Sequence, residues 1–147
     1  AFQGVEHRIE FVRILNGVRY FNDSKATNTD SAIKALEAFD GHVILIAGGD
    51  DKLTDLTEFM ALVHARVDEL ILVGDATERF AAAALEAGIP AERIHRAGYH
   101  MEEAVRIAHE LASAPQTVLL SPACASFDMY GGYEERGRDF KRIVNEL

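Results

Sequence analysis

The segment HVILIAGG at residues 42–49, which is apolar after its histidine and ends in two glycines, restricts the fold most. Such a run is typical of a strand that is buried on both faces of a parallel sheet. Two further runs, at residues 69–73 and 117–122, have the same character. Apolar residues recur at helical spacing in the segments between them. We therefore predict strands that alternate with helices, and hence a parallel sheet covered on both faces.

The helical segments are expected over residues 30–39, 54–67, 76–88, 101–112 and 132–147, with a further short strand over 93–97. Thr54 is the expected N-cap of the second helix. Near the N-terminus, Asn16-Gly17 separates two β-rich runs at 8–15 and 18–22, which is a strong hairpin signal. The predicted fold class is therefore α/β: a Rossmann-like, mostly parallel sheet flanked by helices, with an N-terminal β-hairpin that adds an antiparallel edge. We expect residues 1–147 to form a single domain.

The charge balance restricts the class of partner. The chain has 24 Asp and Glu against 15 Lys and Arg, a net charge of −9. We expect no attraction to nucleic acid or to an anionic membrane surface through such a field. An anionic ligand would need a few cations placed close to it. Cys124 is the only cysteine, so no intrachain disulfide can form, which favours a reducing, cytoplasmic location.

Polar residues cluster where the expected strands end. In open α/β sheets, ligands bind beyond the carboxyl ends of the strands. Three of the segments at that edge are rich in functional groups: NDSKATN (22–28), GGDDKLTD (48–55) and SPACASFD (121–128). The fold should gather these segments from distant parts of the chain. Lys25 and Lys52 are the cations that would make such an edge an anion site.

Common catalytic motifs are missing from this sequence. It has no GxxxxGK[ST], GxGxxG or GxSxG segment, and its six histidines lack metal-ligand spacing. Residue patterns alone leave open a nucleotide-binding module, a receiver-like regulatory domain and a piece of a ligase. Simpler interpretations also remain open: Asp23 and Ser24 as helix caps, Lys52 as a solvated lysine, and Cys124 as a small buried hydrophobic residue.

Four stretches carry a resemblance to a known family: HRIEFV, NDSKATN, GGDDK and LLSPACASFDMYGGYEERGRDF. In this order they resemble the C-terminal domain of the Mur ligases, and NDSKATN and SPACAS resemble the D-glutamate-adding members in particular. The resemblance covers essentially the whole chain. It implies an enzyme of three domains: an N-terminal domain for a UDP-sugar, a central domain with the phosphate-binding loop, and this chain as the C-terminal domain.

The resemblance also implies a reaction. ATP would phosphorylate the carboxylate of UDP-N-acetylmuramoyl-L-alanine, and the amine of D-glutamate would attack the resulting acyl phosphate and release phosphate. The full-length enzyme would use ATP and Mg²⁺, whereas this domain alone would bind neither tightly and would be inactive. The alternative is a stand-alone α/β nucleotide- or anion-binding module that has lost catalysis.

The resemblance further implies roles for single residues. Four residues would bind D-glutamate: Thr27, Lys52, Ser126 and Tyr133. Three would meet the nucleotide: His7, Arg8 and Asp23, the last at the ribose. The catalytic candidate is Lys25, near the reacting carboxylate and phosphate. No residue is assigned to a metal.

The chemistry of D-glutamate agrees with these roles, because a dianion bound by an acidic domain needs placed cations and hydroxyl groups. If Asp23 and Lys25 both lie in extended backbone at the end of the strand, alternation would turn their side chains to the same side. One departure from the family pattern lies nearby: Leu53 stands where many members have glycine.

Overall fold

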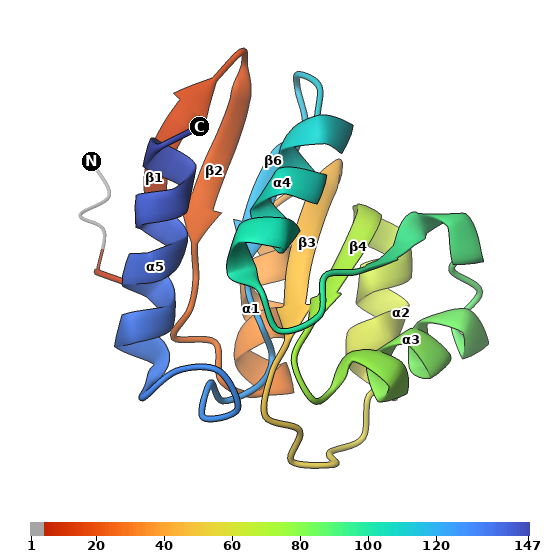
Figure 1. Cartoon of the computed structure of the whole chain (residues 1–147). Helices are drawn as coiled ribbons and strands as arrows, with labels where there is room; N and C mark the ends of the chain where they lie inside the picture. The colour runs from red at the N-terminus through yellow and green to blue at the C-terminus, as the bar shows by residue number, and fades with distance from the viewer. Residues whose placement is uncertain (1–4) are drawn as a thin grey trace.

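The structure, a computed structural model, describes residues 5–147. Its strands are β1 (Glu10–Leu15), β2 (Val18–Asn22), β3 (Val43–Gly48), β4 (Val67–Val73), β5 (Ile94–Arg96) and β6 (Thr117–Leu120). Its helices are α1 (Thr29–Glu37), α2 (Thr57–Arg66), α3 (Thr77–Glu86), the 3-10 turn η1 (Ala91–Arg93), α4 (Met101–Leu111) and α5 (Tyr133–Asn145). Every element expected from the sequence is present (Figure 1).

All six strands form one sheet with the order β1-β2-β6-β3-β4-β5. The hairpin strands β1 and β2 pair antiparallel, and every other neighbouring pair is parallel. The predicted fold class, a mostly parallel α/β sheet with an antiparallel hairpin at its edge, is therefore confirmed. The last strand, β6, lies between β2 and β3 rather than at an edge.

Alternation along the buried strands divides the core into two layers. Val43, Leu45 and Ala47 of β3 pack in one cluster with residues of α1, α2 and α3. Ile44 and Ile46 point the other way, into a cluster with residues of α4 and α5. Both faces of the sheet are thus covered, as Figure 1 shows, and this explains why β3 is apolar at every position.

Two expected element boundaries are wrong. The first strand begins at Glu10 rather than residue 8, because His7 and Ile9 have positive φ angles of 70° and 43° that interrupt extended backbone. The second helix begins at Thr57, so Thr54 is not its N-cap. Asp55 Oδ1 instead accepts hydrogen bonds from the backbone N–H of Thr57 (3.0 Å) and from its hydroxyl (2.8 Å). The segment between β3 and this helix is therefore a longer loop than expected.

The capping of α1 also decides between two interpretations of the segment before it. Asn28 is the N-cap, and its side-chain oxygen accepts a hydrogen bond of 2.9 Å from the N–H of Ser31. Asp23 and Ser24 lie further upstream and are both buried. They do not cap the helix, so their side chains require another explanation.

The two glycines after β3 are required by close contact. Gly48 has φ 116°, and a Cβ there would lie 2.2 Å from the carbonyl oxygen of Val73. Gly49 has φ 136°, and a Cβ there would lie 2.5 Å from the carbonyl oxygen of Ala125. Larger residues would push the chain away from its neighbours. Gly48 thus allows close approach to β4, and Gly49 allows close approach to the loop after β6.

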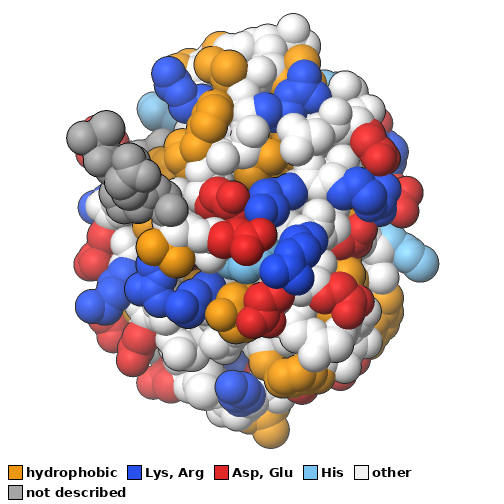
Figure 2. Space-filling model, turned by 90° about the vertical axis from the view of Figure 1, so that its left-hand side faces the viewer, with side chains coloured by type: hydrophobic (Ala, Val, Ile, Leu, Met, Phe, Trp, Pro, Cys, Tyr) orange, Lys and Arg blue, Asp and Glu red, His pale blue; other side chains and the backbone are white. Residues whose placement is uncertain are grey.

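The outer face of the hairpin edge mixes both signs of charge. Figure 2 shows acidic and basic side chains interspersed there. Within this part of the molecule, Lys141 pairs with Glu6 (3.0 Å) and Glu10 (3.2 Å), and Arg138 lies 3.7 Å from Glu6. In the part of the chain that the structure describes, no helix has the length and apolarity needed to cross a membrane.

Candidate functional site

The polar segments singled out from the sequence meet at the carboxyl edge of the sheet. The loops after β2, β3 and β6 lie at the lower edge in Figure 1. The loop after β2 leads to α1 on one face, whereas the loop after β6 leads to α5 on the other face. Neighbouring strands whose connections leave on opposite faces create a crevice, which is where ligands bind in such sheets. The predicted convergence of these loops is thus observed.

One pocket of about 220 Å³ at this edge brings together all four residues that the family resemblance assigns to D-glutamate. We name it the Lys52 pocket, and it is lined by Thr27, Lys52, Ala125, Ser126, Phe127 and Tyr133. These residues come from three loops and the start of α5, up to 106 positions apart in sequence (133 minus 27). Their convergence is a property of the fold that no local pattern shows.

The Lys52 pocket offers a cation and a free hydroxyl. Lys52 is exposed and has no carboxylate within 4.0 Å among residues 5–147. Ser126 is only 2 % exposed, and its Oγ has no hydrogen-bond partner in that same range. A buried hydroxyl normally has a partner, because leaving it unpaired is costly. An anionic ligand that accepts from this hydroxyl and meets the ammonium would satisfy both groups.

The loop that carries Lys52 also contains the departure noted in the sequence. Leu53 has a φ angle of 60°, in the left-handed region that glycine adopts most readily. Its N–H donates a hydrogen bond of 2.9 Å to Asp51 Oδ1, and its side chain is 73 % exposed. The loop therefore keeps a backbone conformation suited to glycine although the residue is leucine.

A second pocket, of about 150 Å³, lies between α1 and the loops on either side of the hairpin. We name it the Asp23 pocket, and it is lined by Arg8, Ile9, Asp23, Lys25, Ala26, Ser31, Lys34 and Ala35. Arg8, Asp23 and Lys25 are three of the residues predicted to meet the nucleotide or the reacting groups. The pocket therefore combines one carboxylate with three cations.

Asp23 is the buried carboxylate of this pocket. Its Oδ1 accepts from the N–H of Ile9 (2.9 Å), and its Oδ2 accepts from the hydroxyl of Ser121 (2.7 Å). Burial raises the pKa of Asp23 to about 6, against the opposing effect of these two hydrogen bonds and of Arg8. Each carboxylate oxygen can accept a further hydrogen bond, which suits the hydroxyl groups of a ribose.

Asp23 and Lys25 do line the same pocket, but not for the expected reason. The backbone there is a turn rather than an extended strand, since the N–H of Ala26 bonds to the carbonyl of Asp23 (2.9 Å). The N–H of Lys25 bonds to the carbonyl of His7 (2.9 Å). The turn, fixed by these bonds, brings both side chains to the lining of the Asp23 pocket.

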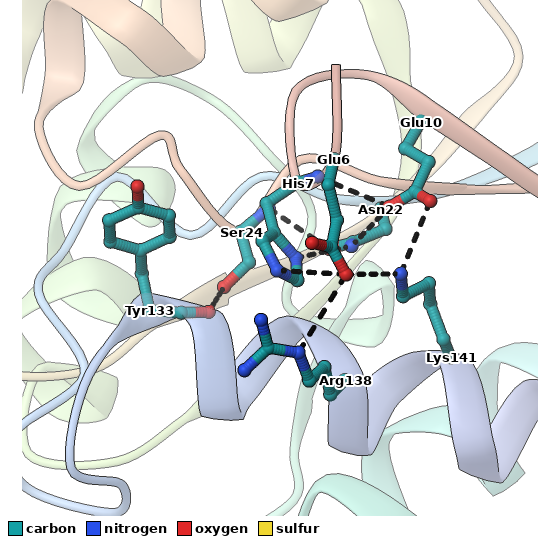
Figure 3. A network of polar contacts seen from close by, with 8 residues as sticks. All are labelled: Glu6, His7, Glu10, Asn22, Ser24, Tyr133, Arg138 and Lys141. Atoms are coloured by element: carbon teal, nitrogen blue, oxygen red, sulfur yellow. Dashed lines mark hydrogen bonds and ion pairs between the residues drawn. The ribbon is translucent and has the colours of Figure 1, made fainter. Parts of the chain in front are cut away.

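His7 lies apart from both pockets. Its side chain is buried against Asn22, whose Nδ2 is 2.9 Å from Nδ1, and its ring meets Tyr133 edge-on at 5.9 Å (Figure 3). Burial lowers its pKa, which favours the neutral ring. Its carbonyl holds Lys25 in place. Its predicted contact with the nucleotide stays a prediction. The backbone of His7, or a movement of this segment, would have to provide that contact.

A polar network surrounds His7 and joins the start of the chain to α5. Glu10 Oε1 accepts from the N–H of His7 (3.1 Å) and from Asn22 Nδ2 (3.0 Å). Its other oxygen is bonded by Lys141 of α5, which also bonds Glu6, as Figure 3 shows. The network fixes the segment that leads into β1, and with it Arg8 at the edge of the Asp23 pocket.

For two buried residues of this edge the expectations differ in outcome: Cys124 is the small buried residue of the simpler interpretation, and Arg136 was not expected. Cys124 is buried, and burial raises the pKa of its thiol to about 12, so it is a small core residue rather than a nucleophile. Sequence patterns assigned no role to Arg136. Its side chain is 2 % exposed and donates hydrogen bonds to Ser24 in the loop after β2 and to Cys124 in the loop after β6. A signal was present: Arg136 stands four residues before Phe140, on the face of the last helix that carries its apolar residues.

Fold and site together are those of an α/β domain with a candidate anion site at the carboxyl edge of its sheet. Comparison with known proteins gives the family. Residues 7–124 match the family model described as "Mur ligase, glutamate ligase domain". The chain belongs to the Mur ligase family.

Curated relatives carry a more specific name. UDP-N-acetylmuramoylalanine–D-glutamate ligases from Thermoanaerobacter sp. (strain X514) and Geotalea uraniireducens are each 49 % identical over 147 residues. The enzyme of the same name from Clostridioides difficile is 47 % identical over the same length. The match covers 100 % of this chain but only 31–32 % of each relative. The chain thus spans about a third of the length of the curated relatives that it matches.

Solved structures show the same fold. A Mycobacterium tuberculosis folylpolyglutamate synthase, complexed with ADP and AMPPCP, matches with a TM-score of 0.66 at 17 % identity. That match covers 93 % of this chain and 32 % of the other. A domain from a putative UDP-N-acetylmuramate:L-alanyl-γ-D-glutamyl-meso-diaminopimelate ligase of Haemophilus ducreyi matches with a TM-score of 0.57 at 14 % identity, over 93 % of this chain and 99 % of that one. At these identities the likeness concerns the fold alone.

Proposed function

We propose that this chain is the C-terminal domain of a three-domain, ATP-dependent ligase that adds D-glutamate to UDP-N-acetylmuramoyl-L-alanine. The observation that carries the proposal is the Lys52 pocket. There an ammonium and a buried hydroxyl, neither with a partner among residues 5–147, line one pocket between loops from distant parts of the chain. The curated relatives at 47–49 % identity bear the name of that reaction and support the choice of D-glutamate.

In this proposal the domain binds and orients the incoming amino acid. Lys52 and the hydroxyl groups of Thr27 and Ser126 hold the carboxylates of D-glutamate, and Tyr133 closes the pocket. Fixing the two carboxylates presents the amine in one direction, so that its attack becomes effectively intramolecular. The product is an amide, and the phosphate of the activated carboxylate is the leaving group.

The Asp23 pocket serves the other side of the same reaction. Asp23 accepts from the ribose hydroxyls of ATP, Arg8 lies beside it, and Lys25 faces the negative charge that develops as the acyl phosphate forms and reacts. A cation placed where charge builds up lowers the barrier more than it strengthens binding. Mg²⁺ and the phosphate-binding loop belong, in this proposal, to the central domain.

The test is steady-state kinetics of the intact three-domain ligase with Lys52→Ala. Loss of a charge-assisted hydrogen bond, about 1.5–3 kcal/mol, should raise the KM for D-glutamate roughly ten- to a hundred-fold and leave the KM for ATP nearly unchanged. Ser126→Ala should act in the same direction but less, since a neutral donor is worth only about 0.5–1.5 kcal/mol. Arg93→Ala, which removes one exposed cation on η1, is the matched control. Equal effects of Lys52→Ala on both substrates would contradict the assignment.

A further inference from the structure

Arg136, in the first turn of α5, is a buried cation with an unusual set of partners. Within the described part of the chain its side chain donates only to neutral acceptors: Nε to Ser24 Oγ (2.9 Å), Nη2 to Ser24 O (2.7 Å) and Nη1 to Cys124 O (3.0 Å). Among residues 5–147 no carboxylate lies within 4.0 Å of it. Through these hydrogen bonds the guanidinium links α5 to the loops after β2 and β6 and does not form an ion pair with any described residue.

Such an arrangement is costly, and packing does not require it. Moving a cation out of water without a counter-ion is unfavourable, and burial accordingly lowers the pKa of Arg136 to about 10. The neighbouring buried positions on this helix, Phe140, Ile143 and Val144, are apolar. An apolar residue at 136 would continue this apolar row without burying a charge, but it would leave the carbonyls of Ser24 and Cys124 without this donor. The hydrogen bonds of the guanidinium are therefore what distinguishes it from such a residue.

The acceptors of Arg136 lie in the same loops as residues that line the Lys52 pocket, although neither acceptor lines it. Ser24 lies three residues before Thr27, and Cys124 lies two residues before Ser126. Ser24 Oγ, which accepts from Arg136, donates in turn to the carbonyl of Tyr133 (2.7 Å, Figure 3). The guanidinium and this one hydroxyl thus connect three of the four segments that line the pocket.

We propose that Arg136 is a positioning residue that holds Thr27, Ser126 and Tyr133 at the spacing D-glutamate requires; the inference rests on the proposed function of the Lys52 pocket. The planar fork of arginine reaches acceptors in three directions at fixed angles. A lysine ammonium on a flexible stem has no such geometry. Arg136 itself does not line the pocket.

The experiment uses the intact ligase and four variants. Arg136→Lys keeps the charge and removes the fork, and Ser24→Ala removes the shared hydroxyl with little change of volume. Arg66→Lys is the matched control: Arg66 also donates only to carbonyls, of Leu36, Glu37 and Phe39, but lies beside the amino end of β4, at the opposite edge of the sheet. Lys52→Ala reports on the pocket itself. KM and kcat are measured for D-glutamate and for ATP, with a thermal melt of each variant.

A misplaced pocket wall should raise the KM for D-glutamate about 10- to 100-fold in Arg136→Lys while the KM for ATP changes less than about two-fold. Ser24→Ala should show the same selective change at about two- to ten-fold, and it carries the test if Arg136→Lys fails to fold. Arg66→Lys should lower the melting temperature with neither KM altered.

Two results would overturn the inference in distinguishable ways. If Lys52→Ala raises the KM for D-glutamate but Arg136→Lys and Ser24→Ala do not, or affect both substrates alike, Arg136 is structural only. If Lys52→Ala itself leaves that KM unchanged, the proposed function is wrong and the inference is overturned together with it.

Discussion

Replacement of Asp23 by asparagine should change stability and function in opposite directions. The side chain is 4 % exposed, and both of its oxygens already accept hydrogen bonds from Ile9 and Ser121. Asparagine has the same shape and can keep the bond from the N–H of Ile9. The hydroxyl of Ser121 can rotate and accept from the new amide. The substitution therefore removes a buried charge without opening a cavity.

The size of the stability gain follows from the pKa. Burial raises the pKa of Asp23 from 3.8 to about 6, and a shift of about 2 units corresponds to about 3 kcal/mol. Because the folded state holds the proton more tightly than the unfolded state, this group destabilises the fold as pH rises. The cost is absent below about pH 4, grows between pH 4 and 6, and is complete above about pH 6. Asp23→Asn should therefore stabilise the domain by up to about 3 kcal/mol at pH 7.5 and by almost nothing at pH 4.

Urea unfolding of the wild-type and Asp23→Asn domains at several pH values measures the gain. Asp40→Asn, which changes an exposed carboxylate, is the control and should shift the free energy of unfolding by less than about 0.5 kcal/mol. In the intact ligase the same Asp23→Asn change should raise the KM for ATP more than it lowers turnover. A loss of stability at pH 7.5, or a gain that does not depend on pH, would show that ionisation of the buried Asp23 does not lower the stability of the wild-type domain.

Three further outcomes are expected. Lys25→Ala in the intact ligase should chiefly lower kcat, and an unchanged kcat with altered affinities would make Lys25 a binding residue only. The isolated chain should neither hydrolyse ATP nor form the amide, and phosphate release above background from the purified chain would refute this. Gly137→Ala should lower the urea midpoint, because a Cβ there would lie 2.1 Å from Nδ1 of His7 and such overpacking costs about 1–3 kcal/mol. A midpoint at or above that of the wild type would show that His7 moves aside freely.

The sequence predicted the elements well because each has a strong local signal. The apolar runs of β3, β4 and β6 could only be buried strands, and Asn16-Gly17 marks the hairpin. Helix starts were less certain, since Thr54, Asp55 and Thr57 are all plausible near a helix terminus. Only the hydrogen bonds of Asp55 show that the helix begins at Thr57. Such local choices depend on tertiary packing that a pattern does not contain.

The site was predicted in part. Its segments could be located because ligands bind beyond the carboxyl ends of parallel strands. Residue patterns alone could not group them into two pockets, because the grouping depends on strand order, and the position of β6 between β2 and β3 has no local signature. Only the family resemblance assigned the residues to two groups. Arg136 was missed since a single arginine on a helix is usually solvated. Its significance appears only when its three acceptors are seen together.

The position of the last strand in the middle of the sheet has a consequence for how the protein folds. β2 and β3 have no hydrogen bonds to each other and are joined only through β6, so the halves of the sheet remain separate until residues 117–120 are in place. On the ribosome, which makes proteins from the N-terminus, β1 to β5 emerge with two unpaired central edges that can aggregate. Pairing across about a hundred residues is slow to nucleate. A nascent chain arrested before residue 117 should therefore depend on chaperones, whereas addition of residues 117–147 completes the sheet, the core and the Lys52 pocket.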